Sequence, residues 1–207
     1  MSNFKIYCVT NKKINFLEKL EYKLAWVGKE KVPENYIKCD YKDNIFYKEK
    51  YYSELTFHYW YWKNLLPLES ENQWIGFCQK RRYWIKGERE VIIDKKNINE
   101  NLLTNIESGK DKFNSIICES ISISGAKKIK ILKRGWKNLI KNPQILFFKN
   151  KQNIKLHFDM HHGYGNLEKA INLLDNADRG DFLKYVKTQT KLNPNIMFIE
   201  KKKIINN

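Results

Sequence analysis

A short apolar run followed at once by cations is the feature that most restricts the fold of this chain. Residues 74–78 read WIGFC, and Gln79, Lys80, Arg81 and Arg82 come directly after them. A strand without a polar face must be covered on both sides, as the central strands of α/β sheets are. In open α/β sheets, ligands bind in the crevice beyond the carboxyl ends of the strands. The run therefore predicts a central strand that delivers Arg81 and Arg82 to a ligand site.

The rest of the pattern is that of an α/β protein of one domain, which 207 residues suffice to build. Residues 4–10 are rich in β-forming side chains and stop at a polar segment, which indicates a first strand. Apolar residues from Ile14 to Leu24 then recur at roughly helical spacing, and residues 24–28 predict a second strand. Further predictions are a loop at 33–50, strands at 115–118 and 196–199, and a helix at 166–175, whereas residues 129–148 fit no single element.

An aromatic-rich segment follows the two predicted strands and precedes the apolar run at residues 74–78. This segment predicts a helix. Ser53 is placed to cap its start, and Pro67 marks its end. Its apolar members follow the i, i+4, i+7, i+11 series of one helix face: Leu55, Tyr59, Trp62 and Leu66. This spacing predicts that these side chains are buried. It leaves Glu54 and His58 on a neighbouring, more polar face that borders a site.

The net charge of +16 raises nucleic acid or an anionic membrane surface as a partner. Of the 39 basic residues only five are arginines, and the lysines are spread along the whole chain. Because arginine grips phosphate in two places, the adjacent pair Arg81-Arg82 is more informative than the total charge. A nucleic-acid-binding module would expose Tyr59, Trp60 and Trp62 on a basic face. We do not favour nucleic acid as the partner.

The cysteines and the N-terminus indicate a protein of the cytoplasm. The four cysteines lie far apart, without the close pairs of a zinc site or a redox motif, and are read as reduced thiols. The apolar run near the N-terminus is too short for a signal peptide or a membrane span.

A second polar cluster occupies residues 156–165. It contains two glycines, three of the four histidines and a carboxylate: His157, Asp159, His161 and His162. Such a cluster suits a general base, acceptor recognition or metal ligation. We favour metal ligation least, because the glycines predict a loop and no second acidic ligand lies nearby.

Several common catalytic motifs are absent from the sequence. It contains no GxGxxG, no Walker loop and no GxSxG, which argues against a dinucleotide oxidoreductase, a P-loop kinase and an α/β-hydrolase. No Asp-x-Asp follows an apolar strand, where a metal-dependent sugar-nucleotide enzyme would carry one. At the corresponding point this chain has Arg81 and Arg82, which could hold a diphosphate as the bond to it breaks or could be solvated charges of a loop.

Four segments resemble motifs of one bacterial protein family. Residues 6–12, IYCVTNK, resemble its IYVVTHK opening, and residues 53–64, SELTFHYWYWKN, resemble its ELTALYWIWKN. Residues 75–84, IGFCQKRRYW, resemble its IGLCHYRRYF, and residues 195–199, NIMFI, resemble its NMFI. The family is that of the bacterial capsular and exopolysaccharide biosynthesis glycosyltransferases, long catalogued as a domain of unknown function. The matches keep their order across almost the whole chain, and together they are specific.

The chain departs from these motifs at two places. Asn11 stands where the family usually has a histidine, and Gln79 and Lys80 stand where it has His-Tyr. We therefore carry over no role for these three positions. The chain also ends soon after residues 195–199, where relatives continue, so we expect it to lack a C-terminal helical extension.

The resemblance implies a GT-A-like α/β fold, with a mostly parallel central sheet flanked by helices, as a single domain over residues 1–207. It implies transfer of a sugar from a nucleoside-diphosphate donor, UDP-linked, to a glycan or lipid-linked acceptor in capsule, exopolysaccharide or lipopolysaccharide synthesis. Carried over by position, eight residues would bind the donor: Thr10, Lys12, Asp43, Asn44, Glu54, Arg81, Arg82 and Asn195.

Under this hypothesis the reaction is a displacement at the anomeric carbon of the donor. Asp159 or His161 would take the proton of the acceptor hydroxyl, and His157 and His162 would contact the acceptor. No cofactor is implied, and a divalent Mn or Mg ion is an alternative that we do not favour. Surface lysines predict peripheral contact with the anionic inner face of the membrane. Two alternatives stay open: a basic nucleic-acid-binding module, and a non-catalytic relative that binds a sugar nucleotide.

Overall fold

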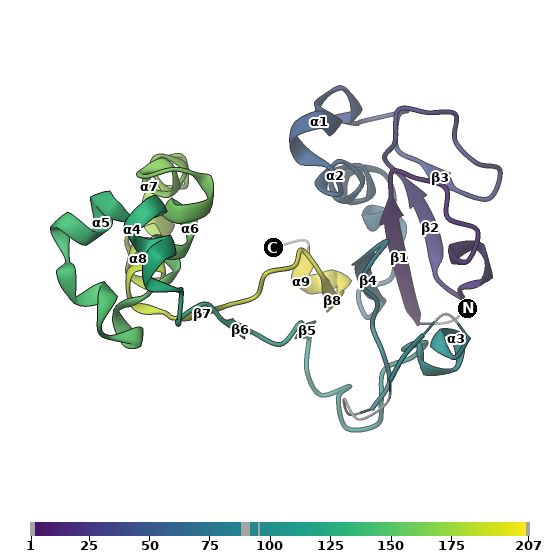
Figure 1. Ribbon diagram of the computed structural model, residues 1–207. Helices are drawn as coiled ribbons and strands as arrows, with labels where there is room; N and C mark the ends of the chain where they lie inside the picture. Colours follow the sequence, from purple (N-terminus) through teal and green to yellow (C-terminus); the bar gives the residue numbers. More distant parts are fainter. Residues whose placement is uncertain (1–2, 88–91, 95, 206–207) are drawn as a thin grey trace. The chain divides into compact units, whose positions relative to one another are not determined.

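The computed structural model of the protein describes residues 3–87, 92–94 and 96–205. By compactness the chain divides into two units (Figure 1). The sheet unit comprises Met1–Cys118 and Ile196–Asn207, and the helical unit comprises Glu119–Asn195. That residues 1–207 act as a single domain stays a prediction.

A six-stranded sheet forms the centre of the sheet unit, in the order β3-β2-β1-β4-β8-β5. β1, β2, β3 and β4 pair in parallel, whereas β8 is antiparallel to both β4 and β5. The mostly parallel α/β sheet predicted from the sequence is therefore confirmed. The strands are β1 (Phe4–Thr10), β2 (Lys23–Trp26), β3 (Ile37–Lys38), β4 (Trp74–Gln79), β5 (Ser115–Ile117) and β8 (Phe198–Lys201).

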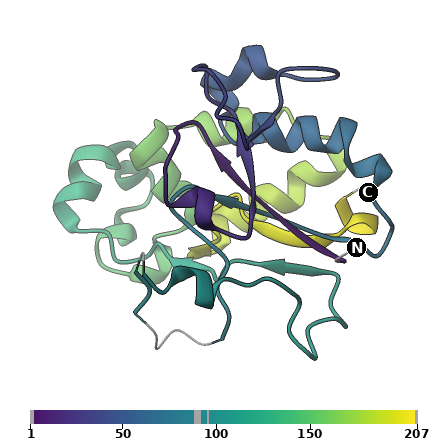
Figure 2. The same cartoon turned by 90° about the vertical axis from the view of Figure 1, so that its right-hand side faces the viewer.

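Both faces of the central strands are buried, as the apolar run predicted. Along β1, Ile6 and Cys8 point into one core cluster, and Tyr7 and Val9 into the other. Helix α2 (Leu55–Asn64) covers the second face, and α3 (Ile98–Asn101) with the 3₁₀ turn η1 (Leu17–Lys19) covers the first (Figure 2). Gly76 of β4 is required because a Cβ there would lie 2.9 Å from Cγ1 of Ile199.

Helix α2 buries a different face from the one predicted. Its buried residues are Thr56, Phe57, Trp60 and Tyr61. Trp62 and Leu55 are exposed and Tyr59 is half-buried, so of the predicted stripe only Leu66, just beyond the helix, lies in the core. Nearly every position of the helix is apolar, so two adjacent rows of side chains satisfy the helical spacing. Packing against the aromatic rings of β1 and β4 buries the row that contains Phe57, Trp60 and Tyr61 instead of the predicted row. Of the three aromatic residues that a nucleic-acid-binding module would expose, Trp60 is buried, Tyr59 is half-buried and Trp62 is exposed, so the burial of Trp60 counts against that alternative and the exposure of Trp62 agrees with it.

The start of α2 also differs from the prediction. Ser53 makes no side-chain cap, and Glu54 occupies the N-cap position. Ser53 instead ends the short helix α1 (Glu49–Tyr52) with φ of 45°. The residue therefore forms a sharp corner between two helices.

Other predicted elements are shortened or shifted. Residues 14–24 contain the turn η1 and the start of β2 in place of a helix, although Leu17, Leu20 and Leu24 are buried. The loop predicted at 33–50 contains β3 and the 3₁₀ turn η2 (Phe46–Lys48), and the last strand begins two residues later than expected. The 3₁₀ turn η3 (Leu66–Leu68) follows α2, and α9 (Lys202–Ile205) follows β8.

The helical unit packs short helices around two small apolar clusters. A loop was predicted over residues 156–165, but α6 extends to His162 and ends at Gly163, whose φ is 96°. The predicted helix over 166–175 is the shorter α7. The elements are α4 (Lys128–Arg134), α5 (Trp136–Lys141), α6 (Ile154–His162), α7 (Asn166–Ile171), α8 (Asn176–Thr188), the 3₁₀ turns η4 (Pro143–Leu146) and η5 (Lys149–Lys151), and the paired strands β6 (Ile121–Ser122) and β7 (Lys191–Leu192).

Candidate functional site

Two turns meet at the carboxyl edge of the central strands. β4 and β2 lie on either side of β1 and run parallel to it, so the residues that follow these strands emerge at one edge of the sheet. Trp26, at the end of β2, lies opposite Thr10, at the end of β1. The ammonium group of Lys80 donates a hydrogen bond to Oδ1 of Asn11. This contact joins the turns that follow β4 and β1.

Arg81 and Arg82 are exposed at this edge. The chain turns tightly after β4, because the backbones of Gln79 and Arg82 exchange hydrogen bonds of 3.2 and 3.1 Å. Nη1 of Arg82 lies 3.4 Å from Oε1 of Gln79. Within the described part of the chain, neither arginine pairs with a carboxylate. Both guanidinium groups are therefore available to an anion.

Thr10 holds the turn that presents Lys12. Its buried hydroxyl donates to the carbonyl oxygen of Lys12 at 2.8 Å and accepts from the backbone N–H of Lys12 at 3.1 Å. The side chain of Lys12 is exposed. The geometry thus gives Thr10 a positioning function and leaves the Lys12 ammonium free to meet a ligand.

A hollow of about 690 Å³ adjoins the same edge. Trp26 is buried in its wall, with Nε1 donating to the carbonyl oxygen of Glu30 at 3.2 Å. Gly28 is required beside it, because a Cβ there would lie 2.7 Å from the carbonyl oxygen of Asn11. The hollow is large enough for a small organic ligand. Its lining residues are Lys13, Trp26, Glu30, Lys31, Val32, Pro33 and Glu34.

The loop that carries Asp43 and Asn44 is fixed to helix α2. Oδ1 of Asp43 accepts from the hydroxyl of Tyr59 at 3.1 Å, and its carbonyl oxygen accepts from Nδ2 of Asn64 at 2.7 Å. Oδ1 of Asn44 accepts from the backbone N–H of Phe46 at 3.0 Å. These polar groups hold the loop in place.

Glu54 and His58 lie in the first part of α2. Glu54 is half-buried at the N-cap. The ring of His58 packs on Phe77, with 4.1 Å between centroids, and its burial lowers the pKa of His58 to about 4. The imidazole is therefore neutral near pH 7. Together with Trp62 and Phe198 it lines an apolar hollow of about 240 Å³.

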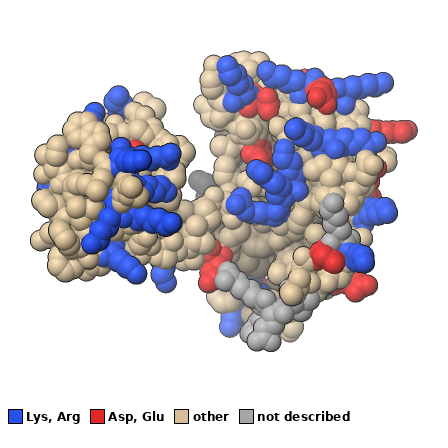
Figure 3. All heavy atoms as spheres, in the orientation of Figure 1, with Lys and Arg blue, Asp and Glu red and all other residues tan. Residues whose placement is uncertain are grey.

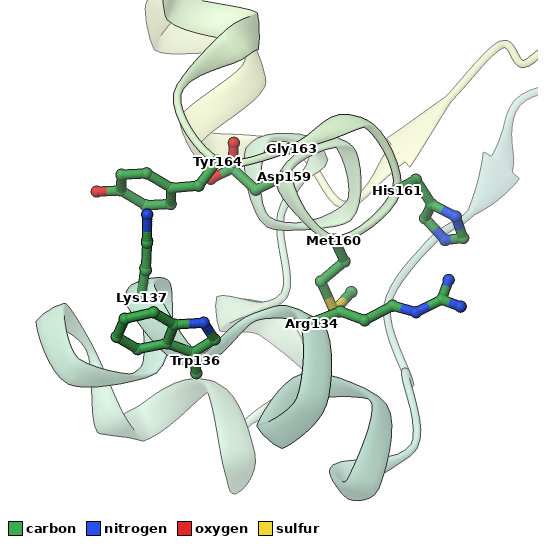
Figure 4. A pocket seen from close by; sticks show the side chains of 8 residues that line it. All are labelled: Arg134, Trp136, Lys137, Asp159, Met160, His161, Gly163 and Tyr164. Atoms are coloured by element: carbon green, nitrogen blue, oxygen red, sulfur yellow. The ribbon is translucent and has the colours of Figure 1, made fainter.

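A further hollow, of about 540 Å³, lies within the helical unit (Figure 4). Nζ of Lys137 lies 5.5 Å from the ring centroids of both Trp136 and Tyr164. Figure 4 shows Arg134 and His161 extending together on the other side of Met160. Aromatic rings beside cations can hold a ligand with both an apolar face and negative charge. The lining residues are Arg134, Trp136, Lys137, Asp159, Met160, His161, Gly163 and Tyr164.

Asp159 is one of the residues that line this hollow of the helical unit, which we call the helical pocket, and both of its carboxylate oxygens accept hydrogen bonds. Its Oδ2 accepts from Nζ of Lys155 at 2.6 Å and from Nδ2 of Asn138 at 2.9 Å, and its Oδ1 accepts from the N–H of Gly165 at 3.1 Å. Lys155 also pairs with Glu168 at 2.9 Å. Burial acts to lower the pKa of Lys155, but its hydrogen bonds and the two carboxylate charges raise it overall. Asp159 therefore fixes the turn between α6 and α7.

His161 reaches the rim of the helical pocket. Its Nε2 lies 3.0 Å from Nζ of Lys130, and because an ammonium group can only donate, Nε2 is the acceptor. Desolvation, followed by the charges of Lys130 and Arg134, lowers the pKa of His161. The ring is thus neutral near pH 7.

The other two histidines of α6 stand apart from this pocket's lining. The rings of His157 and His161 lie 4.6 Å apart, and burial, then the nearby His161 and Lys130, lowers the pKa of His157. His162 packs against Phe158 at 4.5 Å. Neither His157 nor His162 is among the residues that line the pocket.

Asn195, the last residue of the helical unit, carries a buried acceptor. Its Oδ1 receives no hydrogen bond from the described residues. Most buried polar groups have a hydrogen-bond partner, so this oxygen either accepts from a ligand or water or lowers the stability of the fold.

Metal ligands and membrane spans were sought among the described residues. No group of three or more His, Cys, Asp or Glu side chains there could hold a metal ion. No helix there is both long enough and apolar enough to cross a membrane.

Comparison with known proteins identifies the family of this chain. Residues 5–207 match a family described as a domain of unknown function, DUF4422. The chain belongs to this family. No match was found among the curated proteins.

This DUF4422 chain is also similar in fold to part of a solved structure. The fold is similar to that of the bifunctional glycosyltransferase WbbM in its apo form, with a TM-score of 0.64 and 19% sequence identity. The similarity covers all of this chain and 35% of WbbM, so the chain spans about a third of that protein. The α/β fold with a mostly parallel central sheet, as predicted from the sequence, is therefore shared with part of a known glycosyltransferase.

Sequence reasoning missed the aromatic and basic walls of the helical pocket in this DUF4422 member. Arg134, Trp136 and Lys137 fall in the segment that was left unassigned, and Tyr164 was read only as part of a loop. The available signal was the break at Gly135 between two short apolar and basic stretches. A Cβ at Gly135 would lie 3.3 Å from Leu156, which shows how closely this break packs on α6.

Proposed function

We propose that this DUF4422 protein is a glycosyltransferase that moves a sugar from a nucleoside-diphosphate donor, UDP-linked, to a glycan or lipid-linked acceptor. The process would be capsule, exopolysaccharide or lipopolysaccharide synthesis at the cytoplasmic face of the membrane. The observation that carries the proposal is a pair of exposed arginines at the carboxyl edge of a parallel sheet, in a fold shared with a glycosyltransferase.

On the donor side, Lys12, Arg81 and Arg82 would hold the diphosphate. Cations fixed at the leaving group stabilise the charge that develops as the bond to the anomeric carbon breaks. The hollow beside Trp26 would take the nucleoside, since it opens at the same edge. We keep Glu54 and Asn195 as contacts to the donor, and Asp43 and Asn44 as supports of the loop near it, in addition to the positioning function of Thr10.

On the acceptor side, the helical pocket offers Trp136 and Tyr164 as surfaces for the apolar face of a sugar ring. Arg134 and Lys137 would meet a negative group of the acceptor. His157 and His162 lie outside the lining and would contact parts of the acceptor that extend beyond it.

Of the two candidate bases, His161 is the better placed to receive the acceptor proton. It is neutral and lines the pocket, whereas both oxygens of Asp159 already accept hydrogen bonds. For His161 to act as the base, Lys130 must release Nε2 when the acceptor binds. Asp159 would then act through the position of the α6–α7 turn.

A thermal-shift screen of nucleotides and nucleotide sugars, with and without manganese, tests the donor site. We expect UDP or a UDP-sugar to raise the Tm of the wild type without metal, and to raise that of Arg82→Ala less. Lys184→Ala, which removes an exposed cation of α8, is the matched control and should respond like the wild type. If no nucleotide raises the Tm of the wild type, the donor site is refuted.

Release of nucleoside diphosphate distinguishes an enzyme from a non-catalytic relative. The proposal expects slow release from the stabilising sugar nucleotide in water and faster release with a suitable acceptor. Tight binding without release under either condition would instead identify a sugar-nucleotide-binding protein without turnover.

A further inference from the structure

Six large apolar side chains of the helical unit lie outside its core. They belong to α4, α5 and the segment after η4, and each is between 51 and 73% exposed. We call them the apolar face: Ile129, Leu132, Trp136, Ile140, Phe147 and Phe148. Residues 129–148 thus leave six large apolar side chains mostly in water.

The same helices supply a separate set of residues to the core. Ile131 and Ile145 are buried, and Leu139 packs against them together with Leu156 and Met160 of α6. Because the core is already filled by these side chains, the apolar face is not needed for folding of the helical unit. Its exposure calls for another partner.

The sequence around the apolar face is strongly basic. Residues 120–158 contain ten lysines and arginines and no aspartate or glutamate. Figure 3 shows Lys and Arg side chains gathered on the visible side of the helical unit, with few acidic ones among them. Nζ of Lys128 lies 5.6 Å from the ring centroid of Phe147, so cations and apolar residues are interleaved. The partner must therefore carry negative charge and accept apolar groups.

We propose that the apolar face binds the surface of a membrane that contains anionic phospholipids. Aliphatic and aromatic side chains would enter the boundary between headgroups and acyl chains, and the surrounding lysines would meet the lipid phosphates. Trp136 is of the residue type that concentrates at this boundary. Nucleic acid fits less well, because only Trp136, Phe147 and Phe148 offer bases a ring to stack on, whereas Ile129, Leu132 and Ile140 offer none.

A second copy of the chain is also a poorer partner. Two copies meeting through this face would bring two strongly basic surfaces together, and like charges oppose association. An anionic bilayer satisfies both the charge and the apolar side chains.

The inference also bears on the acceptor, and this part rests on the proposed function. Arg134, Trp136 and Lys137 line the helical pocket, and Trp136 belongs to the apolar face as well. Binding through this face would hold the mouth of the pocket at the lipid surface, where a lipid-linked acceptor is anchored.

Vesicle flotation of the full chain tests the membrane surface. The vesicles contain phosphatidylcholine alone, or phosphatidylcholine with about a third phosphatidylglycerol. We expect the protein to float with the anionic vesicles only, and less of it at high salt, because ions screen the lysines. The doubly substituted Ile140→Ser, Phe147→Ser variant should bind at least about tenfold more weakly, since less apolar area enters the bilayer.

Two controls separate this surface from general charge and from unfolding. Leu173→Ser replaces a leucine of the helical unit that is 87% exposed outside the apolar face, and it should bind like the wild type. Circular dichroism and Tm of both serine variants should match the wild type. The vesicle assay uses no nucleotide, so its outcome is independent of the donor site.

Four results would overturn the inference. The first is failure of the wild type to float with anionic vesicles, and the second is equal flotation of wild type and double variant. The third is a concentration-dependent dimer in light scattering that the double variant abolishes, which would make this face a contact between copies. The fourth is binding to single-stranded RNA that the double variant loses while flotation is unchanged.

Discussion

The ammonium group of Lys80 donates a hydrogen bond to Oδ1 of Asn11, across the ends of β4 and β1. These are two of the positions at which the chain departs from the motifs that it otherwise resembles, since Asn11 replaces a histidine and Lys80 a tyrosine. In this chain, each of the two residues supplies the hydrogen-bond partner of the other. The pair adds an oriented cation to the edge where Arg81 and Arg82 lie.

If Lys80 and Asn11 form one part of the donor site, their effects on UDP affinity are coupled. We expect Lys80→Ala to weaken binding, and Asn11→Ala to have much less effect once Lys80 is gone. A double-mutant cycle measured by calorimetry gives the coupling. Additivity within about 0.5 kcal/mol would show that the pair does not act together on the nucleotide.

The two neighbouring tryptophans of α2 differ in their contribution to stability. Trp60 is buried and donates from Nε1 to the carbonyl oxygen of Tyr41 at 2.9 Å, whereas Trp62 is 42% exposed. We expect Trp60→Ala to lower the free energy of unfolding by about 3–5 kcal/mol, through the cavity and the unpaired carbonyl group. Trp62→Ala should cost about 1 kcal/mol or less. Urea denaturation compares them, and the reverse order would contradict the observed face of α2.

His58 makes the stability of the sheet unit depend on pH. Its pKa is about 4 in the folded protein, against about 6.5 in the unfolded chain, so the unfolded state binds the proton more readily. The stability that depends on neutral His58 is complete above pH 6.5 and is lost as the pH falls towards 4.

Replacement of His58 by phenylalanine should remove this dependence and keep the ring on Phe77. Between pH 7.5 and 5, we expect the wild type to lose about 2 kcal/mol more of unfolding free energy than His58→Phe. Urea denaturation at the two pH values measures the difference. Parallel losses in both proteins would show that His58 titrates as it does in the unfolded chain.

We expect Asp159 to contribute to the stability of the helical unit more than to catalysis. Asp159→Asn leaves Lys155 with one carboxylate and sets an amide N–H₂ group against donors, so the free energy of unfolding should fall by about 3 kcal/mol. The matched control is Asp181→Asn, an exposed site on α8, where we expect a change below about 0.5 kcal/mol. An Asp159→Asn protein as stable as the wild type would argue that the network is not stabilising.

The sheet was predictable because its signals are local. The short WIGFC run was recognisable as a covered strand, and β1 begins and ends where its β-rich residues do. The face of α2 was not predictable, because Phe57, Tyr59, Trp60 and Trp62 give two stripes of equal apolar character. Packing of α2 against the core face of the sheet, which includes the rings of Tyr7 and Phe77, decides between them.

The candidate site also has one part that the sequence predicted and one part that it did not. Arg81 and Arg82 follow a recognisable strand, so their position at its carboxyl edge could be inferred. The pocket around Trp136 depends on how α4 and α5 pack on α6 at Gly135, which no spacing reveals. Gly163 and Gly165 suggested a loop for the histidines, but the histidines lie in a helix that extends to His162. Asn153 caps the start of this helix, where its Oδ1 accepts from the N–H of Leu156.

Calorimetric titration of UDP into the protein in the presence of EDTA tests most directly whether arginines, in place of a metal, hold the donor diphosphate. We predict one binding site in the wild type, and at least tenfold weaker binding, about 1.4 kcal/mol or more, in the Arg81→Ala, Arg82→Ala variant. Wild-type binding that appears only when manganese is added, or that is unchanged in the double variant, would contradict the account.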